Sequence, residues 1–525
     1  MNFFKIILLN LLIFSFSYSS TFEELSSKLS DNSFKVKEDV INELIINYKD
    51  EQKLEILLQN MLLGNLYFQN QSNEILFLEK DSFKSLFTNN IISNANQDDF
   101  SKVKINNKLR SVIKASLAKI NLFASDENKR LNAAKNILEN LEEQDKEIIL
   151  EALKTEKKSS IKDILLESLA NITAKFSSGD EQLKAISELG GFLSAKSLET
   201  LTGLKESNDE KVKDAVKDAL NEIELSKRFY SFLETAFFGL SQGSVLLLAA
   251  IGLAITFGVM KVINMAHGEL IMIGAYTTYT IQQLMPNLIE YSVIIAIPAA
   301  FIISGLVGIA IERLVIRHLY GRPLETLLAT FGISLILQQV VRTIFSPLNQ
   351  EVKTPSWMSG ALEINGALSL TYNRLYVVIF AFIVFFAILY VMKKTSLGLK
   401  VRAVSQNRPI ARAMGIQSSK IDAITFGIGS GIAGVAGVAL SQLTNVGPNL
   451  GQAYIVDSFM VVVFGGVGNL WGTLIASFTL GEINKFIEPL AGAILAKVII
   501  LVFIILFIQK RPRGLFPQKG RDAQD

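Results

Sequence analysis

The sequence contains no cysteine and only two histidines, His267 and His318. Disulfides, cysteine-based zinc clusters and thiol catalysis are therefore excluded, and so is a histidine-rich metal site. The net charge of the 525 residues is only +3, and no dense basic run suggests a nucleic-acid partner. No G-x-x-x-x-G-K-[ST] loop and no constellation for nucleophilic or metal catalysis occurs, so we expect no enzyme, no cofactor and no ATP binding through a P-loop of this chain.

Half of the residues are hydrophobic, and they are unevenly distributed. Charged and apolar residues alternate up to about residue 230, whereas long apolar runs with few charges follow. This change predicts a soluble domain over residues 20–228 and a membrane domain over residues 229–525.

The first residues are typical of a targeting segment. Lys5 provides a positive charge, residues 6–16 are apolar, and residues 17–20 are mostly serines that suit cleavage. We therefore predict a signal peptide over residues 1–19, with an uncleaved anchor as the alternative. In either case the soluble domain begins outside the inner membrane.

Helical periodicity dominates the soluble domain, with one exception. Residues 64–78 are better explained as two strands joined by a turn at residues 70–73. Acidic pairs at 126–127 and 180–181 each precede similarly spaced apolar residues, a weak repeat of roughly 50 residues. Helix pairs stacked as a HEAT-like solenoid and an irregular helical bundle explain this pattern equally well.

Nine apolar segments are candidate membrane spans. They are residues 232–257, 262–284, 291–311, 326–345, 375–392, 421–443, 454–467, 471–486 and 494–508. Glycines interrupt the pair at 454–486, which is either two crossings or a broken, re-entrant pair. The predicted fold class is an all-α, polytopic membrane protein of about eight to nine spans, with an N-terminal extracytoplasmic, HEAT-like helical domain that contains a small β-hairpin.

Positive charges between the predicted spans indicate the orientation. Three clusters follow the third, fifth and last segments, and the positive-inside rule places all three in the cytoplasm. The clusters are Arg313, Arg317 and Arg322; Lys393, Lys394, Lys400, Arg402, Arg408, Arg412 and Lys420; and Lys510, Arg511 and Arg513. Counting back along the spans places the helical domain in the periplasm and the C-terminus in the cytoplasm, which agrees with the predicted signal peptide.

A polar motif lies where the first predicted span ends and the second begins. A charged side chain inside lipid costs about 2.5–3.5 kcal/mol, so Asn264, His267 and Glu269 must face a bundle interior, a partner or water. One hypothesis is that these residues line or gate a polar translocation path. The alternative is a capped helix start, with Asn264 as the N-cap and the other two residues in the first turn.

At this motif the chain resembles the branched-chain amino acid permease group of ABC importers. The resemblance rests on Ile-Asn-Met-Ala-His-Gly-Glu at 263–269 and Met-Ile-Gly-Ala-Tyr at 272–276. Other features are similar to the urea-importer branch of that group in particular: residues 320–330, 354–357, 445–452, 457–463 and 507–512, the Asn-Asn-Lys-Leu-Arg stretch at 106–110, and an extended domain behind a signal peptide.

The resemblance implies an inner-membrane permease subunit that imports urea. It also implies the partners: a second related permease subunit, two ABC ATPase subunits and a periplasmic urea-binding protein. An importer of branched-chain amino acids or short amides would share this fold. A different class, a membrane-anchored sensor with an outer ligand- or protein-binding domain, is disfavoured because few residues follow Ile508.

The loop over residues 393–420 is the second candidate element. An alanine followed four residues later by a glycine, here Ala411 and Gly415, is typical of the loop that docks on an ABC ATPase. A short helix with small side chains fits a cleft on the ATPase, and Gly415 would end that helix. A basic loop without a partner is the alternative. The residues expected in the coupling loop are Arg402, Ala403, Gln406, Asn407, Ala411 and Gly415.

Glycines and buried amides or carboxylates complete the predicted path. The glycines at 427, 429, 431, 434 and 437 favour close helix packing, and those at 465, 466, 468 and 472 favour a broken helix near the path. Urea needs acceptors for its N–H groups and a donor for its carbonyl, which polar side chains in a narrow pore provide. Interhelical hydrogen bonding is the alternative role for each. The further candidates are Gln242, Gln338, Gln339, Asp457, Glu482 and Asn484.

Overall fold

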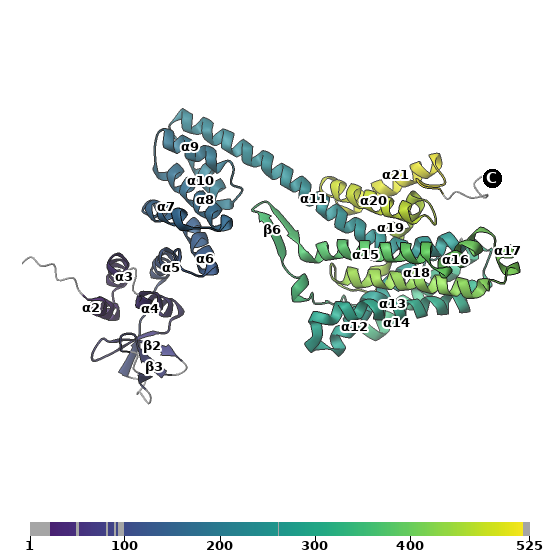
Figure 1. The fold of residues 1–525 in the computed structure, drawn as a ribbon, viewed down its shortest axis with the longest axis horizontal. Helices are drawn as coiled ribbons and strands as arrows, with labels where there is room; N and C mark the ends of the chain where they lie inside the picture. The colour runs from purple at the N-terminus through teal and green to yellow at the C-terminus, as the bar shows by residue number, and fades with distance from the viewer. Residues whose placement is uncertain are drawn as a thin grey trace, which may run out of the picture. The chain divides into compact units, whose positions relative to one another are not determined.

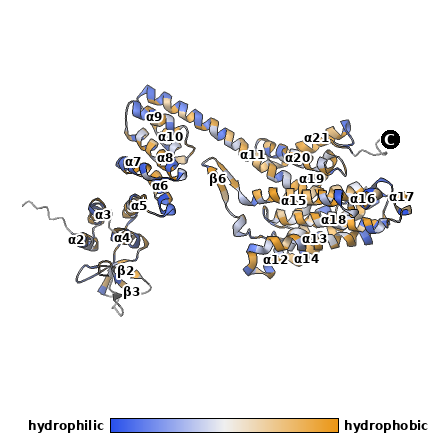
Figure 2. Ribbon diagram, viewed as in Figure 1, coloured by the Kyte–Doolittle hydropathy of each residue, from blue (hydrophilic) through white to orange (hydrophobic). Residues whose placement is uncertain are grey.

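The computed structural model describes residues 21–48, 52–79, 82–88, 91–92, 99–260 and 262–517, and the chain forms two compact units. The division falls between Ser226 and Lys227, whereas the sequence predicts it at 228/229. Polar and apolar residues are mixed along the helices of the first unit, while those of the second are mainly hydrophobic (Figure 2). The predicted signal peptide, residues 1–19, lies outside the described residues.

The first unit is mainly helical (Figure 1). Its helices are α2 (Phe22–Ser27), α3 (Phe34–Tyr48), α4 (Gln52–Leu63), α5 (Asn107–Asn121), α6 (Glu127–Glu139), α7 (Asp145–Thr155), α8 (Ser159–Phe176), α9 (Asp180–Leu189), α10 (Ala195–Leu204) and the first part of α11 (Glu210–Met260). The two acidic pairs of the predicted repeat open helices: Asp126 caps α6 with its side chain, and Asp180 is the first residue of α9.

The predicted strand–turn–strand is confirmed. Strand β1 (Leu66–Gln69) pairs antiparallel with β2 (Ile75–Glu79), with Tyr67 opposite Leu76. The sheet is larger than a hairpin, however, because β3 (Ser82–Ser85), β4 (Ile91–Ile92) and β5 (Phe100–Lys102) extend it in the order β4-β3-β2-β1-β5. These strands have only two to four residues, too few for a periodic sequence pattern to predict them.

Three apolar cores follow one another along this unit. Helices α2 to α5 and the sheet share the first, α5 to α8 share the second, and α8 to α11 share the third. Helix α8 serves two cores, since Leu165 belongs to the second and Ala174 to the third. Such serial cores are what stacked helix pairs require, and a HEAT-type repeat remains a prediction.

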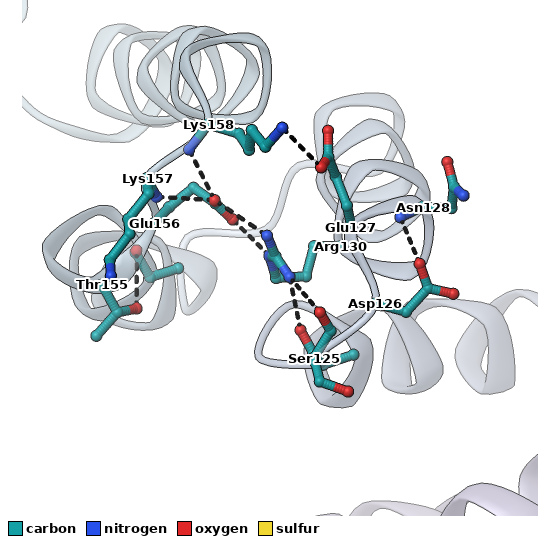
Figure 3. A network of polar contacts seen from close by, with 11 residues as sticks. Ser125, Asp126, Glu127, Asn128, Arg130, Thr155, Glu156, Lys157 and Lys158 are labelled. Carbon is teal, nitrogen blue, oxygen red and sulfur yellow. Dashed lines mark hydrogen bonds and ion pairs between the residues drawn. The ribbon is translucent and has the colours of Figure 1, made fainter.

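An ion pair between α6 and the α7–α8 loop joins the helices of the second core (Figure 3). Arg130 donates from Nε to Glu156 Oε2 at 2.7 Å and from Nη1 to the carbonyl oxygens of Ala124 and Ser125. Glu156 also accepts from the backbone N–H groups of Lys157 and Lys158 at the start of α8. The Arg130 hydrogen bond, helped by these backbone donors, lowers the pKa of Glu156 to about 2.

Replacing Glu156 by glutamine should destabilise α6–α8 by on the order of 2 kcal/mol at pH 7, because hydrogen bonds to a buried charge are lost. Glu156 has a lowered pKa, so its contribution is present above about pH 4.5 and disappears as the pH falls towards 2. Hydrogen exchange of α6–α8 in the full-length protein at several pH values checks this. Glu127→Gln is the matched control, since its ion pair with Lys158 is exposed and contributes little. An equal loss in both variants, or a loss independent of pH, would contradict the assignment.

The second unit, from Lys227 onwards, is a helical bundle with one small hairpin. Its helices are the rest of α11, α12 (His267–Leu284), α13 (Ile289–Leu314), α14 (Pro323–Phe345), α15 (Tyr372–Lys394), α16 (Ser396–Gln406), α17 (Arg408–Ala413), α18 (Ser418–Ser441), α19 (Leu450–Gly465), α20 (Leu470–Ala491) and α21 (Ala493–Lys510). The hairpin, β6 (Ala361–Asn365) with β7 (Leu368–Thr371), lies at one end of the bundle, and α16 and α17 lie at the other (Figure 1).

Six helical segments among the described residues are long and apolar enough to cross a membrane, against about eight to nine predicted spans. They lie at Glu210–Met260, Pro286–His318, Pro323–Phe345, Tyr372–Lys394, Ser418–Ser441 and Ala493–Lys510. The other three predicted spans correspond to α12, α19 and α20. Helix α12 begins with a polar turn, α19 has only 16 residues, and α20 carries charged side chains in its second half, which explains the difference.

Helix α18 is buried almost throughout and packs through its glycines. A Cβ at Gly434 would lie 2.6 Å from the Ala300 carbonyl oxygen of α13, and one at Gly429 would lie 2.7 Å from the Gly252 carbonyl oxygen of α11. A Cβ at Gly437 would collide with the Ile271 carbonyl of α12. The prediction of close packing is thus confirmed, because these helices approach one another backbone to backbone.

The predicted break in the 454–486 segment is a tight turn between α19 and α20. Gly466 has φ 103°, a value that L-residues with side chains rarely adopt. The chain after α21 is hydrogen-bonded to this turn: Leu515 N donates to Phe464 O at 2.9 Å and Phe516 N to Gly465 O at 3.2 Å, and Asn469 Nδ2 donates to Phe516 O. We call residues 511–516 the C-terminal clasp.

Candidate functional site

Helix α12 begins inside the bundle rather than at its end. Helix α11 ends at Met260, and residues 262–266 have no regular structure before α12 starts at His267. His267 Nε2 lies 2.9 Å from the carbonyl oxygen of Ala249. Ala249 precedes the end of α11 by 260 − 249 = 11 residues, roughly 16 Å along a helix. The polar motif is therefore carried into the interior by a non-helical segment.

Two glycines allow neighbouring helices to pack closely against the first turn of α12. Gly252 of α11 lies against the His267 ring, where a Cβ would be 3.0 Å from Cε1. A Cβ at Gly268 would be 2.5 Å from the carbonyl oxygen of Gly451 in the first turn of α19. Helices α12 and α19 thus begin side by side.

Asn264 is buried, but it is not the N-cap of α12. The cap position belongs to Ala266, whose N–H is bound by Asn264 Oδ1 at 3.0 Å. The N–H of Met265 donates to Thr330 Oγ1 of α14 at 3.1 Å. The predicted first-turn positions of His267 and Glu269 are confirmed, whereas the predicted cap is wrong because the helix starts later.

Glu269 is buried, and its carboxylate is held by α14. Its Oε1 accepts from Ser334 Oγ at 2.9 Å and from Gln338 Nε2 at 2.7 Å. We call Asn264, His267, Glu269, Ser334 and Gln338 the α12 polar cluster. Sequence reasoning placed the first three and Gln338 among the path candidates. The structure joins Glu269 to Gln338 and Ser334 of α14, whereas His267 contacts Ala249 of α11.

Three buried atoms of the α12 polar cluster have no hydrogen-bond partner among the described residues: Asn264 Nδ2, His267 Nδ1 and Glu269 Oε2. Buried polar atoms in proteins are nearly always paired. A donor, an acceptor and a ring nitrogen are thus available to water or to a small polar solute.

Ser334 and Thr330 were missed from the sequence, although a signal was present. The buried polar residues of α14 recur every four positions, at Thr326, Thr330, Ser334 and Gln338. This spacing places them on one helical face. Gln339 lies outside this face and is exposed, so its predicted place beside Gln338 in the path is not supported by the structure.

The remaining path candidates lie elsewhere in the bundle. Asp457 of α19 forms an ion pair with Lys497 of α21 at 2.8 Å. Glu482 of α20 packs against Gly239 of α11, and its Oε2 lacks a partner among the described residues. Asn484 of α20 is buried and Gln242 of α11 is half-buried. No hydrogen bond connects any of these side chains to the α12 polar cluster within the described part of the chain.

The loop between α15 and α18 folds as two short helices, α16 and α17. Asn407 joins them, because its side chain accepts from the N–H of Ile410 and caps α17. The expected end of the helix at Gly415 is confirmed: Gly415 has φ 82° and its N–H donates to Arg412 O, while Ile416 N donates to Ala411 O. Arg402 donates to the Met392 carbonyl at the end of α15.

Small and apolar residues of this loop are divided between an inner and an outer face. Ala411 is buried in a local core with Val401, Val404 and Ile421, and Ala403 packs against it. Leu399, Ile410 and Met414 are instead 63%, 60% and 78% exposed. Leu399 lies on α16, Ile410 on α17, and Met414 directly follows α17. Large exposed apolar side chains of this kind are typical of a surface that binds a partner protein.

A cavity of about 740 Å³ lies beside this loop. Arg402 and Gln406 of α16 line it together with Trp471 of α20 and residues of the C-terminal clasp. The expected coupling loop, the α19–α20 turn and the clasp therefore gather at one end of the bundle.

A bundle of apolar helices, with glycine-mediated packing and a polar helix start in its interior, defines a polytopic membrane protein of the permease class. Comparison with known families agrees, since residues 235–508 match the model described as branched-chain amino acid transport system / permease component. The chain belongs to this family. Residues before 235 lie outside the matched region.

Individual relatives support the assignment. The chain is 29% identical over 297 residues to the high-affinity branched-chain amino acid transport system permease protein BraD of Pseudomonas aeruginosa, covering 54% of this chain and 96% of the relative. It is 30% identical over 302 residues to the corresponding protein LivH of Escherichia coli K12, covering 55% and 97%. The ribose import permease protein RbsC of E. coli K12 is 26% identical over 291 residues, covering 54% and 86%. No solved structure matches significantly.

Proposed function

We propose that this chain is a membrane-spanning permease subunit of an ATP-driven importer of a small polar solute. The family membership carries this proposal, and the exposed apolar face of α16 and α17 supports it, because an importer needs a surface on which an ATPase can dock. The proposed partners are a second related permease subunit, two ABC ATPase subunits and a solute-binding protein.

The proposed orientation places α16, α17 and the C-terminal clasp in the cytoplasm and the first unit in the periplasm. Basic residues favour it, since the α15–α18 loop and the segment after α21 are both rich in lysine and arginine. The gathering of these segments at one end of the bundle supports the same assignment.

The α12 polar cluster is the proposed solute-contacting element. Interrupted helices that begin near the middle of a bundle expose backbone N–H groups and polar side chains to a solute in many transporters. Here α12 and α19 begin together, and Glu269 Oε2 and Asn264 Nδ2 are an acceptor and a donor without internal partners.

Branched-chain amino acids are the first substrate class, because the BraD and LivH relatives are named for them. Urea is the second candidate. The sequence stretches similar to the urea-importer branch favour it, and so does the first unit, which lies outside the matched family region. Glu269 suits both, since an α-ammonium group and urea's amides each donate N–H groups.

Uptake by the reconstituted complex separates these substrates. The permease, its partner permease and their ATPases are reconstituted in liposomes with the cognate binding protein. Uptake of radiolabelled leucine and of radiolabelled urea is then measured with and without ATP, each in competition with the other. ATP-dependent uptake of neither solute would refute both substrates, and accumulation that needs no ATP would refute the importer.

Replacing Met414 or Ile410 by aspartate should reduce copurification of the ATPase at least tenfold. Each substitution puts a charge in place of an exposed apolar side chain of the loop, and anchor residues at interfaces contribute about 2 kcal/mol or more. Copurification with the tagged ATPase measures the effect. Leu324→Asp is the control, because Leu324 is equally exposed but lies on α14. Normal ATPase recovery with both loop variants would show that the docking surface lies elsewhere.

The first unit is proposed to contact the solute-binding protein or the partner permease. Deleting residues 21–226 should weaken the response of ATP hydrolysis to the loaded binding protein. If the deletion leaves assembly, uptake and that response unchanged, the proposed contact does not exist.

A further inference from the structure

Two carboxylates are buried where α13 and α18 meet the coupling loop. Glu312, in the last turn of α13, is 0% exposed, and Asp422, in the first turns of α18, is 1% exposed. Buried carboxylates in proteins are paired, because an isolated charge in the interior is strongly unfavourable. In this structure one of the two carboxylates is fully hydrogen-bonded and the other is not.

Asp422 is fully paired by the first residue of α17. Arg408 donates from Nη1 to Oδ2 at 2.7 Å and from Nη2 to Oδ1 at 3.0 Å, a bidentate arrangement. The guanidinium carbon lies 4.6 Å from the centre of the Tyr320 ring, in the segment between α13 and α14. The start of α17 is therefore attached to α18 and to the Tyr320 segment through one side chain.

Glu312 has no such partner. Neither of its oxygens makes a hydrogen bond within the described part of the chain. Its ion pair is with the adjacent Arg313, whose Nε lies 3.6 Å away, beyond hydrogen-bonding distance. The charged groups that act on Glu312 are Arg313, Asp422, Arg317 and Arg408. Helices α13 and α18 pack closely one turn away, where a Cβ at Gly308 would meet Ser430 and Phe426. Glu312 follows Gly308 by one turn and Asp422 precedes Phe426 by one turn, so the guanidinium bound to Asp422 lies at the end of the helix pair that also carries Glu312.

The Arg408 side chain also has space beside it. A cavity of about 600 Å³ is lined by Arg408 and Arg412 of α17, Tyr320 and Thr326. The Arg408 side chain therefore borders open space on one side.

We propose that Arg408 is a positioning residue with two alternative partners, Asp422 in the present conformation and Glu312 in a second one. This inference rests on the proposed function, because movement of α17 by a docked ATPase would drive the exchange. A shift of α17 that releases Asp422 and pairs Glu312 changes the attachment of the loop from α18 to α13. A two-state element of this kind transmits motion as a switch between discrete arrangements.

The test compares two carboxylate-to-amide substitutions in the reconstituted full complex, Asp422→Asn and Glu312→Gln. Asp422→Asn breaks the observed pair and should lower the melting temperature by about 5 °C or more. Glu312→Gln removes a buried charge that makes no hydrogen bond among the described residues and should raise it by about 2–4 °C. Both should lower the solute transported per ATP hydrolysed by about five- to tenfold, because each leaves only one partner for Arg408.

Lys420→Gln is the matched control, since Lys420 is exposed and lies two residues from Asp422 in the sequence, and it should leave both readouts unchanged. Arg408→Lys keeps the charge but cannot pair bidentately, so it should fall between wild type and Asp422→Asn. Unchanged transport per ATP in Glu312→Gln, or equal melting shifts of the same sign in both variants, would overturn the proposal. Absence of ATP-dependent uptake in the wild-type complex would instead refute the proposed function.

Discussion

Replacing Gly274 by alanine should abolish stable folding of the membrane unit. A Cβ at this position in α12 would collide with the carbonyl oxygen of Gly434 in α18. The obstacle is backbone on a buried helix, which cannot turn away as a side chain would, so the two helices must separate. Overpacking of this kind costs about 3 kcal/mol or more. The yield of monodisperse protein in detergent and its melting temperature measure the effect.

Gly332→Ala is the matched control for this experiment. Gly332 lies within α14, and a Cβ there would meet nothing within 4 Å. Alanine favours helix over glycine by about 1 kcal/mol, so this variant should be neutral or slightly more stable. If Gly274→Ala behaves like Gly332→Ala, the close approach of α12 and α18 is wrong.

Replacing Glu269 by glutamine should reduce solute uptake about ten- to hundredfold while leaving the amount of folded protein nearly unchanged. The amide oxygen can still accept from Ser334 and Gln338, so the internal hydrogen bonds are kept. The unpartnered Oε2, in contrast, becomes an N–H donor without charge. Loss of one charge-assisted hydrogen bond of roughly 1.5–3 kcal/mol gives a change of this size.

Two further variants make the Glu269 experiment decisive. Gln339→Leu changes an exposed amide next to Gln338 and should transport normally. Gln338→Leu removes a donor to the buried carboxylate and should lower both stability and uptake. Normal uptake by Glu269→Gln, at wild-type expression, would remove the α12 polar cluster from the translocation path.

Much of the membrane unit could be predicted because its signals are local. Apolar runs predicted the helices α13, α14, α15 and α21. The spacing of Ala411 and Gly415 predicted α17 and its end at Gly415. The glycines of α18 predicted backbone packing because only glycine permits it. What could not be read from local pattern is which helix each glycine faces.

The predicted boundaries of the first two spans were wrong, and both lie where polar and apolar sequence patterns adjoin. The sequence predicts a span that begins at residue 262. In the structure a non-helical segment brings Asn264 and His267 into the interior, so α12 begins five residues later. The span predicted from residue 232 belongs to a helix that already begins at Glu210, since no proline interrupts the change from a polar to an apolar periodicity. Hydropathy detects where side chains change from polar to apolar surroundings, but it does not show whether one helix continues across that point.

The candidate site was predicted as a list of residues rather than as an arrangement. Asn264, His267, Glu269 and Gln338 were named correctly as buried polar groups. The contacts of Glu269 with Ser334 and Gln338, 65 and 69 positions along the chain, depend on how α14 packs against α12, which no local pattern specifies. Ser334 was missed because a serine in an apolar helix commonly bonds its own backbone.

The C-terminal clasp has a consequence for how the protein is made. Residues 515 and 516 supply the N–H groups that bind Phe464 and Gly465, yet they leave the ribosome after every helix of the membrane unit. The turn between α19 and α20, with the cavity beside the coupling loop, is thus completed only when these residues emerge. A stop codon after Lys510 would yield a chain that contains every helix described for the membrane unit and still lacks the C-terminal clasp. Purification tags are accordingly better fused beyond Pro517 than in place of the preceding residues.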